Sequence, residues 1–165
     1  MNKRLIKFKE FKTLVQTICA GIQQDNWKPD YIVGISRGGL LPAVMISHYL
    51  NVPMQSLDVS LRDSGTTVSN LGMAEDAFDG KNILIVDDIN DQGSTLNWIM
   101  KDWPSGCLPY DERWDNIWGS NVRFAVVIDN LSSKCEVKMN YWGTEVNKAE
   151  EDVWIEFPYE EWWTK

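Results

Sequence analysis

The 165-residue sequence predicts an α/β fold in which a mostly parallel central sheet is flanked by helices. Two observations support this prediction. Candidate strands at 31–35, 54–60, 83–86 and 122–128 alternate with helical segments, and that alternation favours a parallel sheet. The run at 83–86 is continuously apolar, which is typical of a strand buried on both faces. We expect a single domain that spans residues 1–165.

The helical segments are identified by apolar spacing. Apolar residues recur at three- and four-residue steps from 8 to 24, so one stripe of this helix should pack on the sheet. Helices are also expected at 40–50 and 94–102. The segment 61–77 is polar and contains glycine, and we expect it to be a mobile active-site loop.

A tryptophan-rich segment, 103–121, separates the last expected helix from the last expected strand. Connections of this kind are usually a few residues long, so we interpret 103–121 as an insertion. Its large aromatic side chains need a cover, and we expect either a local subdomain or a subunit contact to provide it. The aromatic residues concerned are Trp103, Tyr110, Trp114 and Trp118.

The most informative segment is 83–96, where the apolar run leads into three carboxylates, a glycine and two hydroxyl residues. Ligands of parallel sheets bind beyond the carboxyl ends of the strands, which is where these side chains emerge. The segment lacks a Walker A sequence and a G-x-G-x-x-G fingerprint, and as an EF-hand loop it lacks the final glutamate. The residues are Asp87, Asp88, Asp91, Gly93, Ser94 and Thr95.

A helix that starts near Ser94 would point backbone N–H groups at one phosphate. The acids before it would repel a polyphosphate, whereas a sugar monophosphate could place its ring hydroxyls on Asp87 and Asp88. An alternative is that Asp91 or Ser94 merely caps the helix, but capping needs one such residue and not three acids in five positions.

The segment resembles the ribose-5-phosphate-binding signature of the type I phosphoribosyltransferases, most closely the xanthine-guanine and hypoxanthine subgroup. The resemblance spans roughly residues 30–160 and implies this fold with a small C-terminal hood at 129–165. It implies that Asp87 and Asp88 bind the ribose hydroxyls and that Asp91 is the catalytic proton acceptor near purine N7. It assigns the 5′-phosphate to Asp91, Gln92, Gly93, Ser94 and Thr95.

A glycine-rich turn after the first buried strand resembles the pyrophosphate loop of the same family. Glycines let a backbone approach an anion closely, and an arginine adds a charged fork. The family often has a non-proline cis peptide in this loop, which would fall at Ser36–Arg37. The implied pyrophosphate-binding residues are Ser36, Arg37, Gly38 and Gly39.

Near the C-terminus, residues 152–160 resemble the aromatic hood of the subgroup, although an aromatic segment that simply covers the core would look similar. The resemblance implies that Trp154 stacks on the base and that the Ile155 backbone meets its edge. It also places Glu160 near a Mg²⁺ ion, which Asp87 and Asp88 would bind directly or through water.

Two positions depart from the family pattern. Gln92 stands where a threonine commonly helps to hold the phosphate, which predicts weaker affinity at most. Asn130 stands where the family has a lysine that donates to the purine 6-oxo oxygen. Asn130 is therefore the expected base contact, and because an amide can donate or accept, a strict preference for 6-oxopurines is in doubt.

Composition excludes several other functions. The formal charge of −8 opposes a nucleic-acid surface. The sequence contains neither a signal peptide nor an apolar run long enough to span a membrane, and three scattered cysteines are typical of a cytoplasmic protein. The single histidine, His48, opposes a histidine metal site or catalytic triad. We expect a homo-oligomer.

The leading hypothesis is a Mg²⁺-dependent purine phosphoribosyltransferase that joins guanine, xanthine or hypoxanthine to phosphoribosyl diphosphate and releases pyrophosphate. One alternative is a non-catalytic module of the same fold that binds phosphoribosyl diphosphate or a nucleotide. A third is a family member that acts on another base such as a pyrimidine, which the purine-type hood opposes.

Overall fold

The protein is described here by a computed structural model that places residues 1–59 and 68–165. Its centre is a five-stranded parallel sheet with the strand order β3-β2-β4-β5-β6. The predicted α/β class is therefore confirmed, and all five carboxyl ends lie at one edge of the sheet. The strands are β2 (Tyr31–Ser36), β3 (Met54–Asp58), β4 (Ile83–Asn90), β5 (Val122–Asn130) and β6 (Tyr141–Val146).

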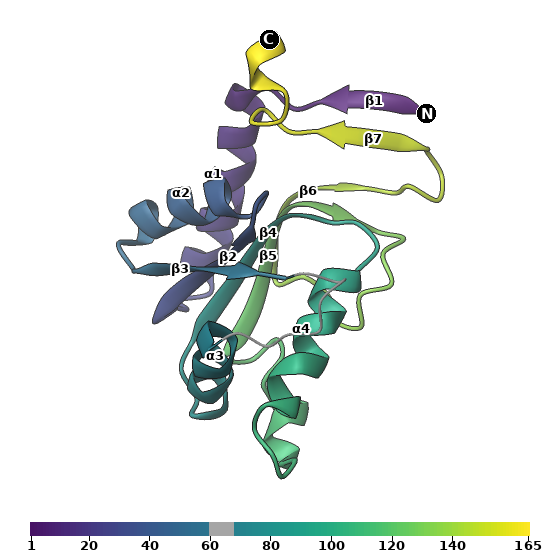
Figure 1. The fold of residues 1–165 in the computed structure, drawn as a ribbon. Coiled ribbons are helices and arrows are strands. Elements are labelled where there is room, and N and C mark those ends of the chain that lie inside the picture. The colour runs from purple at the N-terminus through teal and green to yellow at the C-terminus, as the bar shows by residue number, and fades with distance from the viewer. Residues whose placement is uncertain (60–67) are drawn as a thin grey trace.

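Helices cover both faces of this sheet (Figure 1). The helices α1 (Phe8–Gln24) and α2 (Leu40–Leu50) share one apolar core with Leu84 and Val86 of β4. The helices α3 (Val68–Phe78) and α4 (Ser94–Ser105) lie on the other face, whose core contains Ile83 and Ile85. This alternation along β4 explains its continuous apolar run, because side chains on successive strand residues point to opposite faces.

A second, two-stranded sheet stands apart from the main sheet (Figure 1). It pairs β1 (Asn2–Leu5) in parallel with β7 (Val153–Glu156), and a short 3-10 helix, η2 (Trp162–Thr164), follows. The expected hood at 129–165 therefore has different limits. Its first part, through β6, belongs to the central sheet, and the N-terminal strand completes the hood.

The segment 61–77 differs in part from the expected mobile loop. Residues 61–67 lie outside the described residues, but 68–77 belong to α3. Three small or flexible apolar side chains of α3 are buried against the sheet, namely Met73, Ala74 and Ala77. Their spacing places them on one helix face, and this apolar stripe explains why the segment is helical despite its polar composition.

The tryptophan-rich segment is covered by the core of the same chain, so the expected subunit contact is not needed to bury it. Trp103 and Trp114 are each 1% exposed, and Trp118 stacks on Phe124 of β5 with ring centroids 6.0 Å apart. The segment includes the last turn of α4 and a 3-10 helix, η1 (Glu112–Asn116). Tyr110 is the exception, because it remains exposed.

Among the described residues, no helix combines the length and apolar character needed to cross a bilayer.

Candidate active site

A cavity of about 260 Å³ opens where β4 ends and α4 begins. Six of the residues predicted to hold a sugar phosphate line it, together with Ile89, Asn90 and Leu96, whereas Asp88 is not among the lining residues. The six are Asp87, Asp91, Gln92, Gly93, Ser94 and Thr95. Gly93 is the N-cap of α4, and no side chain caps the helix. The alternative that Asp91 or Ser94 serves as a cap is therefore wrong. The first N–H groups of α4 keep their capacity to bind an anion.

Glycine is required at position 93 of this turn for two separate reasons. Its φ of +85° lies in the left-handed region, which side chains other than glycine adopt at a cost. A Cβ atom there would also lie 2.3 Å from the backbone nitrogen of Cys135. The loop after β5 is bound to the turn as well, because the Lys134 N–H donates to the Gln92 carbonyl at 3.1 Å. The close packing of Gly93 against Cys135 and the hydrogen bond from Lys134 to Gln92 together hold the cavity wall in place.

Two adjacent carboxylates stand at the floor of the site. The backbone N–H of Asp88 donates to Asp87 Oδ1, and that of Ile89 donates to Asp88 Oδ1, each at 2.8 Å. Burial, followed by the charge of Asp88, raises the pKa of Asp87 well above its usual range. A divalent cation or a set of sugar hydroxyls would offset this unfavourable concentration of negative charge.

The third expected metal ligand is not gathered with these two. Within the described residues no group of three or more histidine, cysteine, aspartate or glutamate side chains is arranged to hold a metal. Glu160 instead accepts a hydrogen bond from the Phe157 N–H at 3.2 Å. Mg²⁺ commonly uses one or two carboxylates and completes its shell with water and substrate oxygens, so Asp87 and Asp88 fit this ion without Glu160.

The glycine-rich turn lies directly beside the two acids. The peptide bond between Ser36 and Arg37 is cis, as the family resemblance implied. A Cβ atom on Gly38 would lie 2.0 Å from Asp88 Oδ2, and one on Gly39 would lie 2.4 Å from the Val86 carbonyl oxygen. Glycine is therefore needed for the turn to pack against β4, and Arg37 is left exposed beside the site.

Tyr159 connects the hood to this floor. Its hydroxyl lies 2.7 Å from Asp88 Oδ2 and 3.1 Å from the Gly38 carbonyl oxygen. Its ring also packs edge-on against Phe11 of α1, with centroids 6.0 Å apart. Burial and the neighbouring Asp88 charge raise the pKa of Tyr159, so its hydroxyl stays protonated and can donate. One side chain thus joins the hood, the glycine turn and an acid.

Replacing Tyr159 with Phe should lower the free energy of unfolding by about 1–3 kcal/mol, because Asp88 would lose a buried donor. Urea unfolding measures the change. Tyr49→Phe is the matched control, since the Tyr49 hydroxyl donates to Gln23 at an exposed position. Equal stability losses in the two variants would show that the Tyr159 bond does not hold the hood.

Asp91 is held by two neighbours at the end of β4. Lys148 Nζ lies 3.0 Å from Asp91 Oδ1, and the Lys148 side chain is only 18% exposed. Asn130 donates through Nδ2 to the Asp91 carbonyl oxygen at 2.8 Å. The same Lys148 ammonium lies 6.0 Å from the ring centroid of Trp154. A carboxylate, an ammonium and an indole are therefore brought together from three separate segments.

Asn130 has a supporting role in this arrangement. It is 3% exposed, and its Oδ1 accepts hydrogen bonds from the Ser132 hydroxyl at 2.9 Å and the Lys148 N–H at 3.0 Å. Its amide would have to give up these bonds to contact a base. Asn130 thus binds Asp91, Ser132 and Lys148 in this structure, and its expected contact with a base stays a prediction.

The two remaining hood residues differ in exposure. Trp154 is 50% exposed, which leaves ring surface free for stacking. Ile155 is 5% exposed, so its side chain belongs to the core, and only its backbone could meet a ligand.

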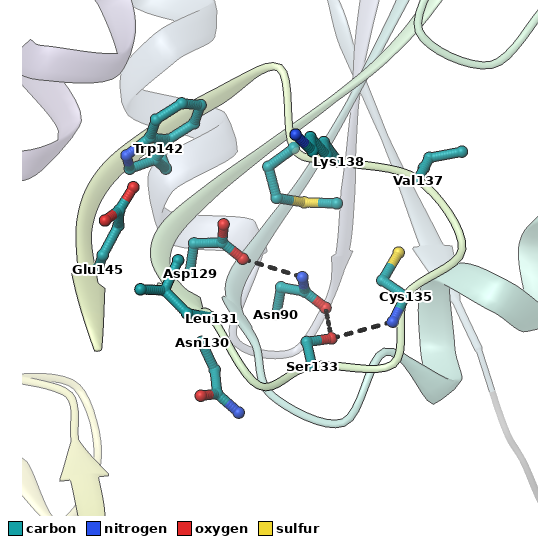
Figure 2. A pocket seen from close by; sticks show the side chains of 11 residues that line it. Asn90, Asp129, Asn130, Leu131, Ser133, Cys135, Val137, Lys138, Trp142 and Glu145 are labelled. Atoms are coloured by element: carbon teal, nitrogen blue, oxygen red, sulfur yellow. Dashed lines mark hydrogen bonds between the residues drawn. The ribbon is translucent and has the colours of Figure 1, made fainter. Parts of the chain in front are cut away.

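A neighbouring cavity of about 340 Å³ lies behind the end of β5 (Figure 2). Asn90 donates to Asp129 at 2.9 Å, and the Ser133 hydroxyl donates to Asn90 at 2.8 Å (Figure 2). The cavity is also lined by Glu145, and burial raises the pKa of Asp129. Such an acidic cavity does not suit a phosphate. We interpret its hydrogen bonds as support for the strand ends beneath the site.

Sequence reasoning missed two residues of this site, Lys148 and Tyr159. Tyr159 carried a detectable signal, because it lies within the hood segment already identified. Lys148 carried none, since it lies in a short polar connection before β7 and reaches the site only through the fold.

Comparison with known proteins agrees with this geometry. The phosphoribosyl transferase domain family matches residues 2–161. The chain is 26% identical over 167 residues to the hypoxanthine-guanine phosphoribosyltransferase of Schizosaccharomyces pombe, covering 82% of this chain and 79% of that protein. It is 29% identical over 141 residues to the xanthine-guanine phosphoribosyltransferase of Cereibacter sphaeroides, covering 82% and 72%.

Solved structures show the same fold. The purine phosphoribosyltransferase of Pyrococcus horikoshii superposes with a TM-score of 0.68 at 23% identity, covering 98% of this chain and 96% of that one. The xanthine-guanine-hypoxanthine phosphoribosyltransferase of Helicobacter pylori gives a TM-score of 0.69 at 16% identity, covering 99% and 97%.

Proposed function

Because the chain belongs to the phosphoribosyl transferase family, we propose that it joins a purine base to phosphoribosyl diphosphate, forming a nucleoside monophosphate and pyrophosphate. The observation that carries this proposal is the cavity at the start of α4, which has Asp91 on its wall. The names of the similar proteins support purines as the acceptors. The retained acids and cavity favour catalysis over a non-catalytic binding module.

Three parts of the site would bind the donor. The N–H groups of 93–95 and the hydroxyls of Ser94 and Thr95 would bind the 5′-phosphate. Asp87 and Asp88 would accept hydrogen bonds from the ribose 2′ and 3′ hydroxyls. The turn at 36–39, with the charge of Arg37, would bind the pyrophosphate. Gln92 lines the same cavity and, like Ser94, is exposed.

Displacement of pyrophosphate passes through a ribosyl group with oxocarbenium character, so positive charge develops on the sugar. The carboxylates of Asp87 and Asp88 would stabilise that charge from beneath the ring. Mg²⁺, held by these two residues directly or through water, would supply neutralisation of the departing pyrophosphate. Glu160 could take part only through water or after a movement of the hood.

The acceptor base would lie against Trp154, with its edge near the Ile155 backbone and its N7 proton facing Asp91. As N9 forms the bond to the ribose, the proton on N7 must leave the base. The Asp91 carboxylate is the proposed acceptor. Asn130, through its bond to the Asp91 backbone, would hold this carboxylate in position.

A base panel tests the proposal. The protein is incubated with Mg²⁺, phosphoribosyl diphosphate and each of guanine, xanthine, hypoxanthine and adenine, and nucleotide formation is measured. We expect transfer to at least one 6-oxopurine and its loss when a chelator removes Mg²⁺. Full activity in excess chelator would refute the metal requirement, and transfer to none of the bases would refute the proposed function.

A further inference from the structure

We propose that Tyr159 is a positioning residue of the donor site, whose hydroxyl holds the Asp88 carboxylate in the orientation that receives a ribose hydroxyl. This inference rests on the proposed function and deepens it. It names a residue of the hood that acts on binding of the sugar and not on binding of the base.

The hydrogen bonds of the Asp88 carboxylate are the first observation. Asp88 Oδ1 accepts a hydrogen bond from the Ile89 N–H at 2.8 Å, and Asp88 Oδ2 accepts one from the Tyr159 hydroxyl at 2.7 Å. Each oxygen of a carboxylate can accept two hydrogen bonds, so each keeps one acceptor position for a ligand. With a donor fixed on each oxygen, the carboxylate cannot turn about its Cβ–Cγ bond without breaking a hydrogen bond.

The surroundings of Asp88 Oδ2 are the second observation. A Cβ atom on Gly38 would lie 2.0 Å from this oxygen, and the Tyr159 hydroxyl lies 3.1 Å from the Gly38 carbonyl oxygen. The hydroxyl carries a single proton, and the shorter of its two distances assigns that proton to Asp88. The proposed ribose acid is therefore packed between the proposed pyrophosphate turn and the hood.

The third observation is that packing places the Tyr159 ring independently of its hydroxyl. The ring stacks on Phe157 with centroids 5.7 Å apart, and it packs edge-on against Phe11 with centroids 6.0 Å apart. Both phenylalanines are fully buried. A rigid ring thus presents its hydroxyl to Asp88, and a binding group that is fixed in this way by a second side chain is preorganised for its ligand.

Removing the hydroxyl should weaken binding of the sugar and spare binding of the phosphate. The probes are ribose 5-phosphate and inorganic phosphate, each titrated without Mg²⁺ and followed by NMR of the protein. Both would use the phosphate site at 93–95, and only the first carries ring hydroxyls. In Tyr159→Phe, affinity for ribose 5-phosphate should fall about tenfold, because Asp88 loses the donor that fixes it, and affinity for inorganic phosphate should stay within about threefold.

Tyr49→Phe is the matched control, since the Tyr49 hydroxyl donates to Gln23 at an exposed position. It should keep both affinities. Both ligands are measured on one preparation, so a partly unfolded fraction does not alter the ratio of the two affinities.

An unchanged affinity for ribose 5-phosphate in Tyr159→Phe would overturn the inference and leave the proposed function standing. An equal loss with the two ligands would do the same, because it would mean that the variant disturbs the phosphate site and not Asp88. An original protein that binds ribose 5-phosphate no more tightly than inorganic phosphate would also overturn the inference. Failure of the base panel would instead refute the proposed function itself.

Discussion

Replacing Asp91 with Asn should slow nucleotide formation by about 10²- to 10⁴-fold, the usual contribution of a general base. The amide keeps the size of the side chain and can still accept a hydrogen bond from Lys148, but it cannot take a proton from the base. Turnover should therefore fall more than affinity for either substrate. Single-turnover kinetics with saturating phosphoribosyl diphosphate and base measure this step.

The matched control for this variant is Asp152→Asn, which removes an exposed carboxylate at the start of the hood. It should keep the original turnover. If Asp91→Asn also kept it, Asp91 would have no part in the proton transfer, and the acceptor would have to be sought among Asp87, Asp88 and water.

Replacing Gly93 with Ala should have the largest effect on donor binding. The left-handed conformation alone costs an L-residue about 1–2 kcal/mol. The added Cβ would in addition lie 2.3 Å from the Cys135 nitrogen, so either the turn or the loop after β5 must move. We expect affinity for phosphoribosyl diphosphate to fall at least about tenfold, equivalent to 1.4 kcal/mol, as measured by titration calorimetry.

The control variant Gly80→Ala separates the cost of the left-handed backbone conformation from the cost of the steric clash with Cys135. Gly80 has a φ of +90°, but a Cβ atom there would meet nothing within 4 Å. This control should lose stability from the backbone term alone and bind the donor normally. If the two alanine variants lost equal stability in urea and bound the donor equally well, the close approach of Cys135 would not be holding the cavity.

The central sheet could be predicted because its signal is local. The strand at 83–86 is apolar on both faces, and the helix at 8–24 has one apolar stripe, so each element is specified by its own residues. The strand boundaries were less well predicted. β4 continues through Asp87 and Asp88 to Asn90, because backbone pairing with β5 extends into the polar residues.

The strand pairing that builds the hood could not be predicted from local patterns. β1 pairs with β7 across almost the whole chain, with Arg4 opposite Ile155, and the four residues of β1 are too short and charged to indicate a strand. The same limit applies to the tryptophans of 103–121. These tryptophans are buried against Phe124 and the face of the sheet that α3 and α4 cover. The sequence alone does not show that this face lies beneath them.

The donor half of the site was predicted better than the acceptor half for the same reason. Residues 87–95 are contiguous, so their joint geometry follows from one strand, one turn and one helix. The base contact expected at Asn130 depends on which groups compete for its amide. Three segments meet at that amide, because Asn130 binds both Asp91 and Lys148, and such long-range contacts are not visible in the local sequence.

The most direct test of the account is the stoichiometry of transfer. Phosphorus NMR of the protein with Mg²⁺, phosphoribosyl diphosphate and hypoxanthine should show the donor replaced by equal amounts of nucleoside monophosphate and pyrophosphate. Formation of ribose 5-phosphate and pyrophosphate without nucleotide, or a donor that persists unchanged at high protein concentration, would contradict it.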